Sequence, residues 1–203
     1  MNNVAFAFIL ILMVIFVLGA FVLLFLSIWK NRHTAFQRGE EGEASISALL
    51  DELVDESSYV LNDLVIDEGG IHTQIDHLFI SLGGIVVIET KNLSGRIYGK
   101  DNSAYWLQVL RNGKKYKIYS PILQNETHMR AIRTILKENG YQKIELLSSI
   151  VLVKGNTEFI KSSHVYSPYT LKRYIRSIKN DVIYSEEEIN RIYDLLKKYQ
   201  NNK

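Results

Sequence analysis

The chain has 203 residues, 47% of them hydrophobic and 23% charged, which is the balance of a folded protein rather than a disordered one. It contains no cysteine, which excludes disulfide bonds, thiolate catalysis and cysteine-ligated zinc or iron–sulfur centres. The formal net charge is +2, but residues 39–89 hold twelve acidic residues and no Lys or Arg, whereas residues 91–143 hold eleven Lys or Arg and three acids. Such neighbouring segments suit a site that holds a cation and contacts a polyanion, and they equally suit solvated faces of opposite sign.

The first element is an apolar segment without any charged residue, Val4–Trp29. As a helix it would span about 39 Å at about 1.5 Å per residue, which exceeds the roughly 30 Å hydrocarbon core of a bilayer. We therefore predict a transmembrane anchor over residues 1–30 that contacts the lipid bilayer through residues 4–29. A cleaved signal peptide fits less well, because no basic segment precedes the long apolar run and no clear small-residue cleavage site follows it.

The charges that flank this segment predict its orientation. Only Met1–Asn3 precede it, whereas Lys30, Arg32 and Arg38 follow it. Positive residues favour the cytoplasmic side of a membrane. We therefore predict a single-pass protein of the cell membrane with its N-terminus outside and the rest of the chain in the cytoplasm. Residues 31–38 are interpreted as a basic juxtamembrane linker.

The remaining chain has the pattern of a mixed α/β domain, in which helices cover a sheet. A capping box at Ser185 and Glu188 marks the start of the last helix. The expected helices are Gly39–Val54, Pro121–Asn139, Tyr169–Lys179 and Ser185–Tyr199. The expected strands are Tyr59–Ile66, two strands within Thr73–Lys91 joined at Gly83-Gly84, Gly95–Tyr98, Tyr105–Leu110, Tyr116–Tyr119 and Ile144–Val153.

Three ionisable residues stand within the apolar stretch Thr73–Lys91, where charge is rarely buried unless it is paired or bound to a metal. Glu89 and Lys91 share one face of a strand because side chains alternate, and Asp76 can reach the same place if the two strands pair. Two close carboxylates favour a cation such as Mg²⁺ or Mn²⁺, and a neighbouring lysine can orient water or stabilise negative charge. The trio predicts metal-assisted hydrolysis of a phosphodiester. A buried ion-paired trio with a structural role is the alternative.

Five motifs occur in order along the first two thirds of the chain. They are Gly39-x-x-Gly42-Glu43; Gln74-Ile75-Asp76-His77; Gly83-Gly84 followed by Val87-Ile88-Glu89-Thr90-Lys91; Gly95; and Ser120-Pro121-x-x-Gln124-x-x-x-His128. A chain with these motifs resembles the nuclease-related domain (NERD) family, a branch of the PD-(D/E)xK nuclease superfamily. The resemblance implies a restriction-endonuclease-like, four-stranded mixed sheet flanked by helices. The nuclease-related core would cover residues 39–153, with a helical region over 154–203 packed on it.

The resemblance also implies a role for five residues. Asp76 and Glu89 would be the metal ligands, with Mg²⁺ or Mn²⁺ as the cofactor, and Lys91 would be the catalytic lysine. Glu43 would complete or orient the metal site, and Gln124 would position substrate or water. Plainer readings remain for the last two, since Glu43 could be a helix acid stabilised by the helix dipole and Gln124 an ordinary polar residue.

Two histidines and one basic hairpin region carry weaker signals. His77 is expected on the face opposite Asp76, as a packed or surface residue rather than a ligand, and His128 ends its motif without an assigned role. The hairpin region holds cations that could follow a nucleic-acid backbone and aromatic residues that could stack on bases. For any single one of them, an exposed twisted hairpin with cross-strand aromatic pairs is the favoured explanation. These residues are Arg96, Lys100, Arg111, Lys114, Lys115 and Lys117, with Tyr98, Tyr105 and Trp106.

The sequence therefore predicts a membrane-tethered, metal-dependent nuclease that hydrolyses phosphodiester bonds of DNA, or else RNA, at the cytoplasmic face. The main alternative is a catalytically silent module that binds nucleic acid or protein and is localised by its membrane helix. A third hypothesis is a membrane sensor or scaffold, in which basic residues of the C-terminal helices contact anionic lipid.

Overall fold

The computed structural model describes residues 3–201, without the side chains of residues 3–7, 9, 10, 31 and 32. The chain divides into two compact units, residues 1–40 and residues 41–203. Helix α1 (Asn3–Asp51) contributes to both units.

Helix α1 is uninterrupted, so the predicted anchor from Asn3 onward, the predicted linker and most of the predicted helix Gly39–Val54 belong to one element, which ends at Asp51. Residues 1 and 2 of the predicted anchor lie outside the described residues. The segment 31–38 contains no proline, and two side chains bind carbonyls one turn earlier: Thr34 Oγ1 donates to Lys30 O at 2.8 Å and Arg38 Nε donates to Thr34 O at 3.1 Å. Because the segment contains neither proline nor glycine, no residue in it breaks the helix.

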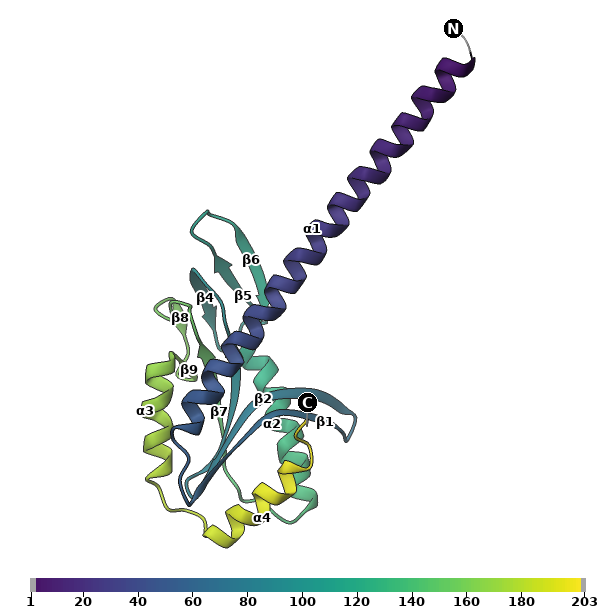
Figure 1. Ribbon diagram of the computed structural model, residues 1–203. Helices are drawn as coiled ribbons and strands as arrows, with labels where there is room; N and C mark the ends of the chain where they lie inside the picture. The colour runs from purple at the N-terminus through teal and green to yellow at the C-terminus, as the bar shows by residue number, and fades with distance from the viewer. Residues whose placement is uncertain (1–2, 202–203) are drawn as a thin grey trace. The chain divides into compact units, whose positions relative to one another are not determined.

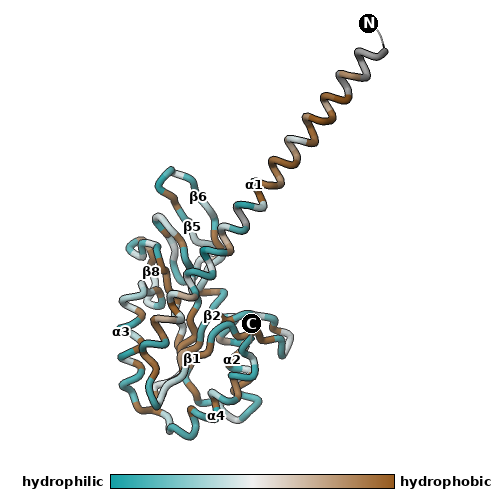
Figure 2. The backbone as a smooth tube through the Cα atoms, viewed as in Figure 1, coloured by the Kyte–Doolittle hydropathy of each residue, from teal (hydrophilic) through white to brown (hydrophobic). Residues whose placement is uncertain are grey.

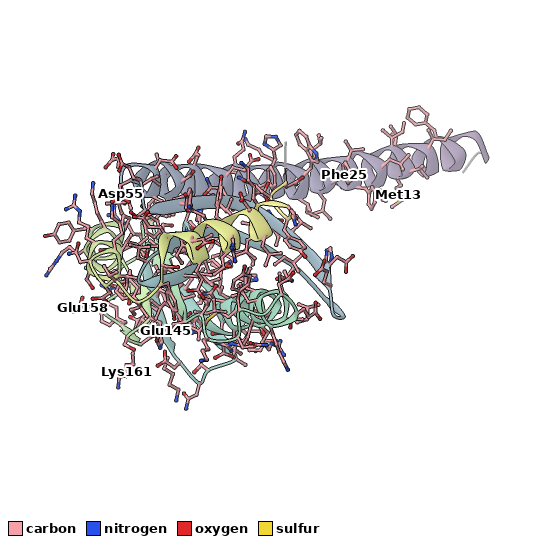
Figure 3. All side chains as sticks on the ribbon, turned by 90° about the horizontal axis from the view of Figure 1, so that it is seen from below. Met13, Phe25, Asp55, Glu145, Glu158 and Lys161 are labelled. Carbon is pink, nitrogen blue, oxygen red and sulfur yellow. The ribbon has the colours of Figure 1, made fainter. Side chains whose placement is uncertain are left out.

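The first part of α1 is long and apolar enough to span a membrane by length and composition, a criterion that a signal sequence also meets. Its described side chains from Ile11 to Trp29 are all exposed. Figure 2 shows this stretch in brown, and Figure 3 labels Met13 and Phe25, whose side chains project outward from the helix.

The principal sheet has five strands in the order β1-β2-β3-β7-β9 (Figure 1). Strands β1, β2 and β3 pair antiparallel, whereas β3, β7 and β9 pair parallel. The first four strands match the expected four-stranded mixed core, and β9 adds a short fifth strand at the edge. The bounds are β1 (Ser58–Glu68), β2 (Ile71–Ser81), β3 (Gly84–Lys91), β7 (Leu146–Leu152) and β9 (Val165–Tyr166).

Helices cover both faces of this sheet, which confirms the mixed α/β class. Helices α2 (Pro121–Glu138) and α4 (Glu186–Lys197) pack on one face, and α3 (Pro168–Lys179) with residues 46–50 of α1 packs on the other. Ile85 and Val87 of β3 point to the first face, and Val86 and Ile88 point to the second. Burial from both sides explains why β3 is a continuous apolar run rather than an alternating one.

A second sheet has four strands in the order β6-β5-β4-β8. Its strands β4, β5 and β6 lie in the chain between β3 and α2, and β8 follows β7. Trp106 and Ile97 on its inner side pack against Ile150 and Leu152 of the principal sheet. Gly99 passes directly over Trp106, where an added Cβ atom would lie 2.4 Å from the indole ring. The bounds are β4 (Arg96–Lys100), β5 (Tyr105–Val109), β6 (Lys115–Tyr119) and β8 (Ile160–Lys161).

The capping box predicted for the last helix is formed in one direction. Ser185 Oγ accepts a hydrogen bond from Glu188 N at 3.2 Å. The reciprocal arrangement occurs instead at the start of α3, where Ser167 and Thr170 each accept from the backbone of the other. Both serines thereby satisfy a backbone N–H that has no partner within its helix.

Candidate functional site

Strands β2 and β3 separate at Asp76. Their main-chain pairing starts at the Ser81–Gly84 end and finishes at His77 and Ile88. Beyond that point the Asp76 carboxylate bridges the strands, because its Oδ2 accepts a hydrogen bond from Thr90 N at 2.7 Å. The aspartate therefore has a fixed position in the split between the two strands. Glu89, the residue before Thr90, lies next to it.

The partner strand has an unusual backbone conformation opposite this split. Asp63 of β1, which faces Asp76, has a φ of 55° and is the one residue other than glycine with a positive φ within residues 3–201. Aspartate tolerates this left-handed region better than most residues do. Gln74 Nε2 donates to Asp63 Oδ1 at 2.6 Å, which links the two strands on the outer side of the split.

Glu89 and Lys91 project from the same face of β3, as their spacing predicts. Lys91 Nζ lies 2.5 Å from Glu89 Oε1 and donates a hydrogen bond to Gln124 Oε1 of α2 at 3.1 Å. The Glu89 side chain is 1% exposed and the Lys91 side chain 24% exposed. The lysine ammonium is thus the point at which this buried cluster meets solvent.

His128 holds the second oxygen of Glu89. Its Nε2 lies 2.9 Å from Glu89 Oε2, and its Nδ1 lies 2.7 Å from Thr73 Oγ1 of β2. An ionised carboxylate only accepts hydrogen bonds, so Nε2 carries the proton in this contact. His128 and Gln124 are four residues apart on α2 and therefore face the same direction. The sequence motif contained His128, but nothing in it identified Glu89 or Thr73 as its partners.

The start of α2 is fastened to the sheet by Asn125. Its Nδ2 donates to Val87 O of β3 at 2.9 Å and to Ser148 Oγ of β7 at 2.8 Å. Asn125 is fully buried, and such contacts fix a helix against a sheet in one position. This anchor sets where Gln124 and His128 meet β3, and sequence reasoning did not single it out.

The charges of the cluster are unbalanced. Burial raises the pKa of Asp76 to about 8, and the neighbouring carboxylates of Glu89 and, less strongly, Glu43 act in the same direction. The hydrogen bond from Thr90 N and the charge of Lys91 oppose this rise. A carboxylate in this setting is stabilised in its ionised form by additional positive charge.

The structure brings together four of the five residues that the resemblance singled out, namely Asp76, Glu89, Lys91 and Gln124. Glu43, half-buried on α1, lies near enough for its charge to raise the pKa of Asp76.

His77 lies on the opposite face of β2, as expected for a packed residue. Its Nδ1 is 2.7 Å from Asn62 Oδ1, and Asn62 in turn donates to Ser47 Oγ of α1 at 2.9 Å. Burial lowers the pKa of His77 to about 4, so this histidine is neutral at pH 7. It therefore belongs to the packing between α1 and the sheet.

Asp76 and Glu89 are the residues that could hold a metal ion here. Within residues 3–201, no group of three or more His, Asp or Glu side chains is arranged around a common point. Two carboxylates are nevertheless a normal protein contribution for Mg²⁺, which keeps several of its own waters. Both Glu89 oxygens already have partners, and Lys91 is the more exposed of these, so it is the partner with room to move aside. The donor set fits a hard, largely hydrated divalent cation.

Comparisons with known proteins agree with the motifs. The family model of the nuclease-related domain matches residues 38–153, which include all of the residues of this cluster. An uncharacterized protein of Bacillus anthracis is 31% identical over 169 residues, which cover 80% of this chain and 77% of that protein. No solved structure matches the chain.

The contact between His128 and Glu89 can be tested by a double-mutant cycle. We expect His128→Ala to lower the free energy of unfolding by about 2 kcal/mol, because it removes a donor from a buried carboxylate. Glu89→Gln should cost less in that background than in the wild type, with a coupling of about 1 kcal/mol. Urea unfolding of the full-length chain in detergent micelles, followed by tryptophan fluorescence, measures both.

His164→Ala is the matched control, since His164 is exposed and its substitution should have little effect. Additive costs of His128→Ala and Glu89→Gln would show that the two side chains do not interact.

Proposed function

Because the chain belongs to the nuclease-related domain family, we propose that it is a metal-dependent nuclease that hydrolyses phosphodiester bonds of DNA, with RNA as the second candidate substrate. Family membership supports a nuclease-related function. The observation that carries the proposed reaction is the cluster at the split between β2 and β3, where Asp76 and Glu89 lie beside the ammonium of Lys91.

Two carboxylates would hold the cofactor. Asp76 is fixed by Thr90 N and Glu89 by His128, so both oxygen donors are oriented before any ion arrives. A bound Mg²⁺ or Mn²⁺ would supply an activated water and would neutralise charge on the phosphoryl oxygens. Glu43 adds a further negative charge near Asp76, which favours a cation at this position.

Lys91 would act on the substrate. Before an ion binds, its ammonium is held by Glu89 Oε1 and by Gln124 Oε1. When it leaves Glu89 for a metal ion, Gln124 would keep it at the edge of the cluster, where it meets solvent. A cation at this place can stabilise the negative charge that develops on a phosphodiester during attack, or orient the attacking water. Gln124, whose carbonyl oxygen accepts from Lys91, would keep the lysine in place and direct its own amide N–H groups toward water or substrate.

A catalytically silent binding module remains a second candidate because of one observation. Glu89 uses one oxygen for Lys91 and the other for His128, which is also how a structural buried ion pair satisfies a carboxylate. Such a protein would bind nucleic acid without cleaving it. The two candidates differ in whether Lys91 leaves Glu89 when a cation is supplied.

The proposed nuclease is tethered to the cell membrane by the first part of α1. Residues 4–29 would lie in the bilayer, the N-terminus outside and the nuclease-related domain in the cytoplasm. The apolar, exposed helix supports the tether, and Lys30, Arg32 and Arg38 after it support the orientation.

Cleavage assays on the full-length chain in detergent micelles test the proposed reaction. With Mg²⁺ or Mn²⁺ the wild type should cleave DNA, tested as supercoiled, linear and single-stranded molecules, and EDTA should stop it. Asp76→Ala and Lys91→Ala should each lower the rate by about 100-fold or more, because each removes charge from the site of reaction. Lys143→Ala, an exposed lysine outside the cluster, should cleave at the wild-type rate.

An unchanged rate for Lys91→Ala would contradict the proposed mechanism. DNA binding that needs no metal and leads to no cleavage would favour the silent module.

Proteolysis of membrane vesicles tests the orientation. In inverted vesicles the protease should digest residues 41–203, because the cytoplasmic side faces outward, and in right-side-out vesicles these residues should be protected. The fragments are followed by immunoblotting against the C-terminus. Digestion in right-side-out vesicles alone would reverse the proposed orientation.

A further inference from the structure

The outer side of the second sheet carries tyrosines in register on neighbouring strands. Tyr105 of β5 is opposite Tyr119 of β6, and Leu107 of β5 lies between Tyr98 of β4 and Lys117 of β6. Residues directly opposite each other in a ladder point to the same face. We call Tyr98, Tyr105, Leu107, Lys117 and Tyr119 the tyrosine face.

The tyrosine face is exposed, whereas the other side of the sheet is buried at Ile97 and Trp106 and becomes exposed at Tyr116, near the hairpin turn. Tyr105 and Tyr119 are each 52% exposed, while Trp106, which points the opposite way from β5, is 1% exposed. The rings of Tyr105 and Tyr119 are 6.0 Å apart in an edge-to-face arrangement. Soluble proteins commonly expose single, scattered apolar residues. Several exposed aromatic residues gathered on one surface are instead characteristic of interaction sites.

The charge around this face identifies the partner as a polyanion. Residues 94–120 contain six Lys or Arg and a single acid, Asp101. Lys117 Nζ lies 3.9 Å from the centre of the Tyr105 ring, so a cation and an aromatic surface occur at the same place. Rings that stack on bases, with cations beside them for phosphates, are the chemistry of single-stranded nucleic-acid binding. A duplex would not present the faces of its bases to these rings.

Short chain segments connect the strands of the tyrosine face to the candidate site at both ends. Arg96, the first residue of β4, follows Lys91 by five residues, and Tyr119, the last residue of β6, precedes Gln124 by five. A groove that begins at Tyr119 continues along α2 past Arg130 and Arg133, and one acid, Glu126, also lines it. A strand bound on this face would therefore have further cations along its path beside the helix that carries Gln124 and His128.

We propose that the tyrosine face binds unpaired bases and that the substrate is a nucleic acid with a single-stranded segment next to the cleaved bond. The assignment of a cleaved bond rests on the proposed nuclease function, whereas strand binding does not. Tyr105 and Tyr119 supply the stacking surfaces, and Lys117 and its neighbouring cations bind the phosphates.

Fluorescence anisotropy on the full-length chain in detergent micelles tests this inference, with EDTA present so that nothing is cleaved. The probes are a labelled oligothymidine of about 20 nucleotides, an abasic strand of equal length and a duplex, because one binding module covers about 4–16 nucleotides. The double variant Tyr105→Ala/Tyr119→Ala should bind oligothymidine at least about tenfold more weakly than the wild type. The wild type should bind oligothymidine more tightly than the abasic strand or the duplex.

Two matched variants separate stacking from folding. Tyr105→Phe/Tyr119→Phe keeps the rings and should bind oligothymidine within about twofold of the wild type. Tyr169→Ala removes a more accessible tyrosine from α3, 71% exposed, and should bind as the wild type does.

Equal binding of oligothymidine by the wild type and the double alanine variant would overturn the inference, as would equal binding of oligothymidine and the abasic strand by the wild type. Hydrogen exchange in lipid nanodiscs supplies a further test. Protection of β4–β6 by phosphatidylserine, without protection by oligothymidine, would identify a membrane-contacting surface and overturn the inference. The binding assay contains no metal and so does not depend on catalysis. Absence of cleavage in the separate assay with Mg²⁺ or Mn²⁺ would contradict the proposed nuclease and not the binding of unpaired bases.

Discussion

The carboxylate of Glu89 is the constraint on which this structure depends. It lies at the end of the central strand with 1% of its side chain exposed, where an unpaired charge would cost several kcal/mol. Its two oxygens are satisfied from different elements, by Lys91 of β3 itself and by His128 of α2. The helix must therefore lie with Gln124 and His128 against the end of β3, and Asn125 fastens it there. The same contacts that satisfy the buried charge assemble the candidate site.

Asp76 adds a second carboxylate at the point where the regular main-chain pairing of β2 and β3 ends. The two strands separate there, and a side chain replaces the main-chain link. A raised pKa is the electrostatic sign that this arrangement is less favourable without a further positive charge. Buried groups that conflict with stability in this way are typical of functional sites, where the rest of the fold compensates for them.

The parts of this account that the sequence predicted are those set by local periodicity and by short motifs. Alternation along a strand placed Glu89 and Lys91 on one face, and the apolar run Ile144–Val153 indicated the strand that the structure has at Leu146–Leu152. The motif order led to the mixed sheet and to Gln124 beside the site.

What the sequence could not predict depends on packing between distant residues. Glu89 and His128 are 39 residues apart, and their contact exists only because Asn125 sets the position of α2. The short strands β8 and β9 have two residues each, which is too few to show the alternation of apolar and polar residues that indicates a strand. The continuity of α1 was missed because its composition changes from apolar to acidic, although nothing in residues 31–38 ends the helix.

Metal binding without substrate tests the central claim most directly. Mn²⁺ binding to the full-length chain in detergent micelles can be followed by electron paramagnetic resonance, in which free Mn²⁺ gives the signal. The account predicts that the wild type binds Mn²⁺, that Mg²⁺ displaces it, and that Asp76→Asn and Glu89→Gln each weaken binding by about tenfold or more, since each removes one of two anionic ligands. Undiminished binding in both variants would contradict the assignment of these two carboxylates as the metal site.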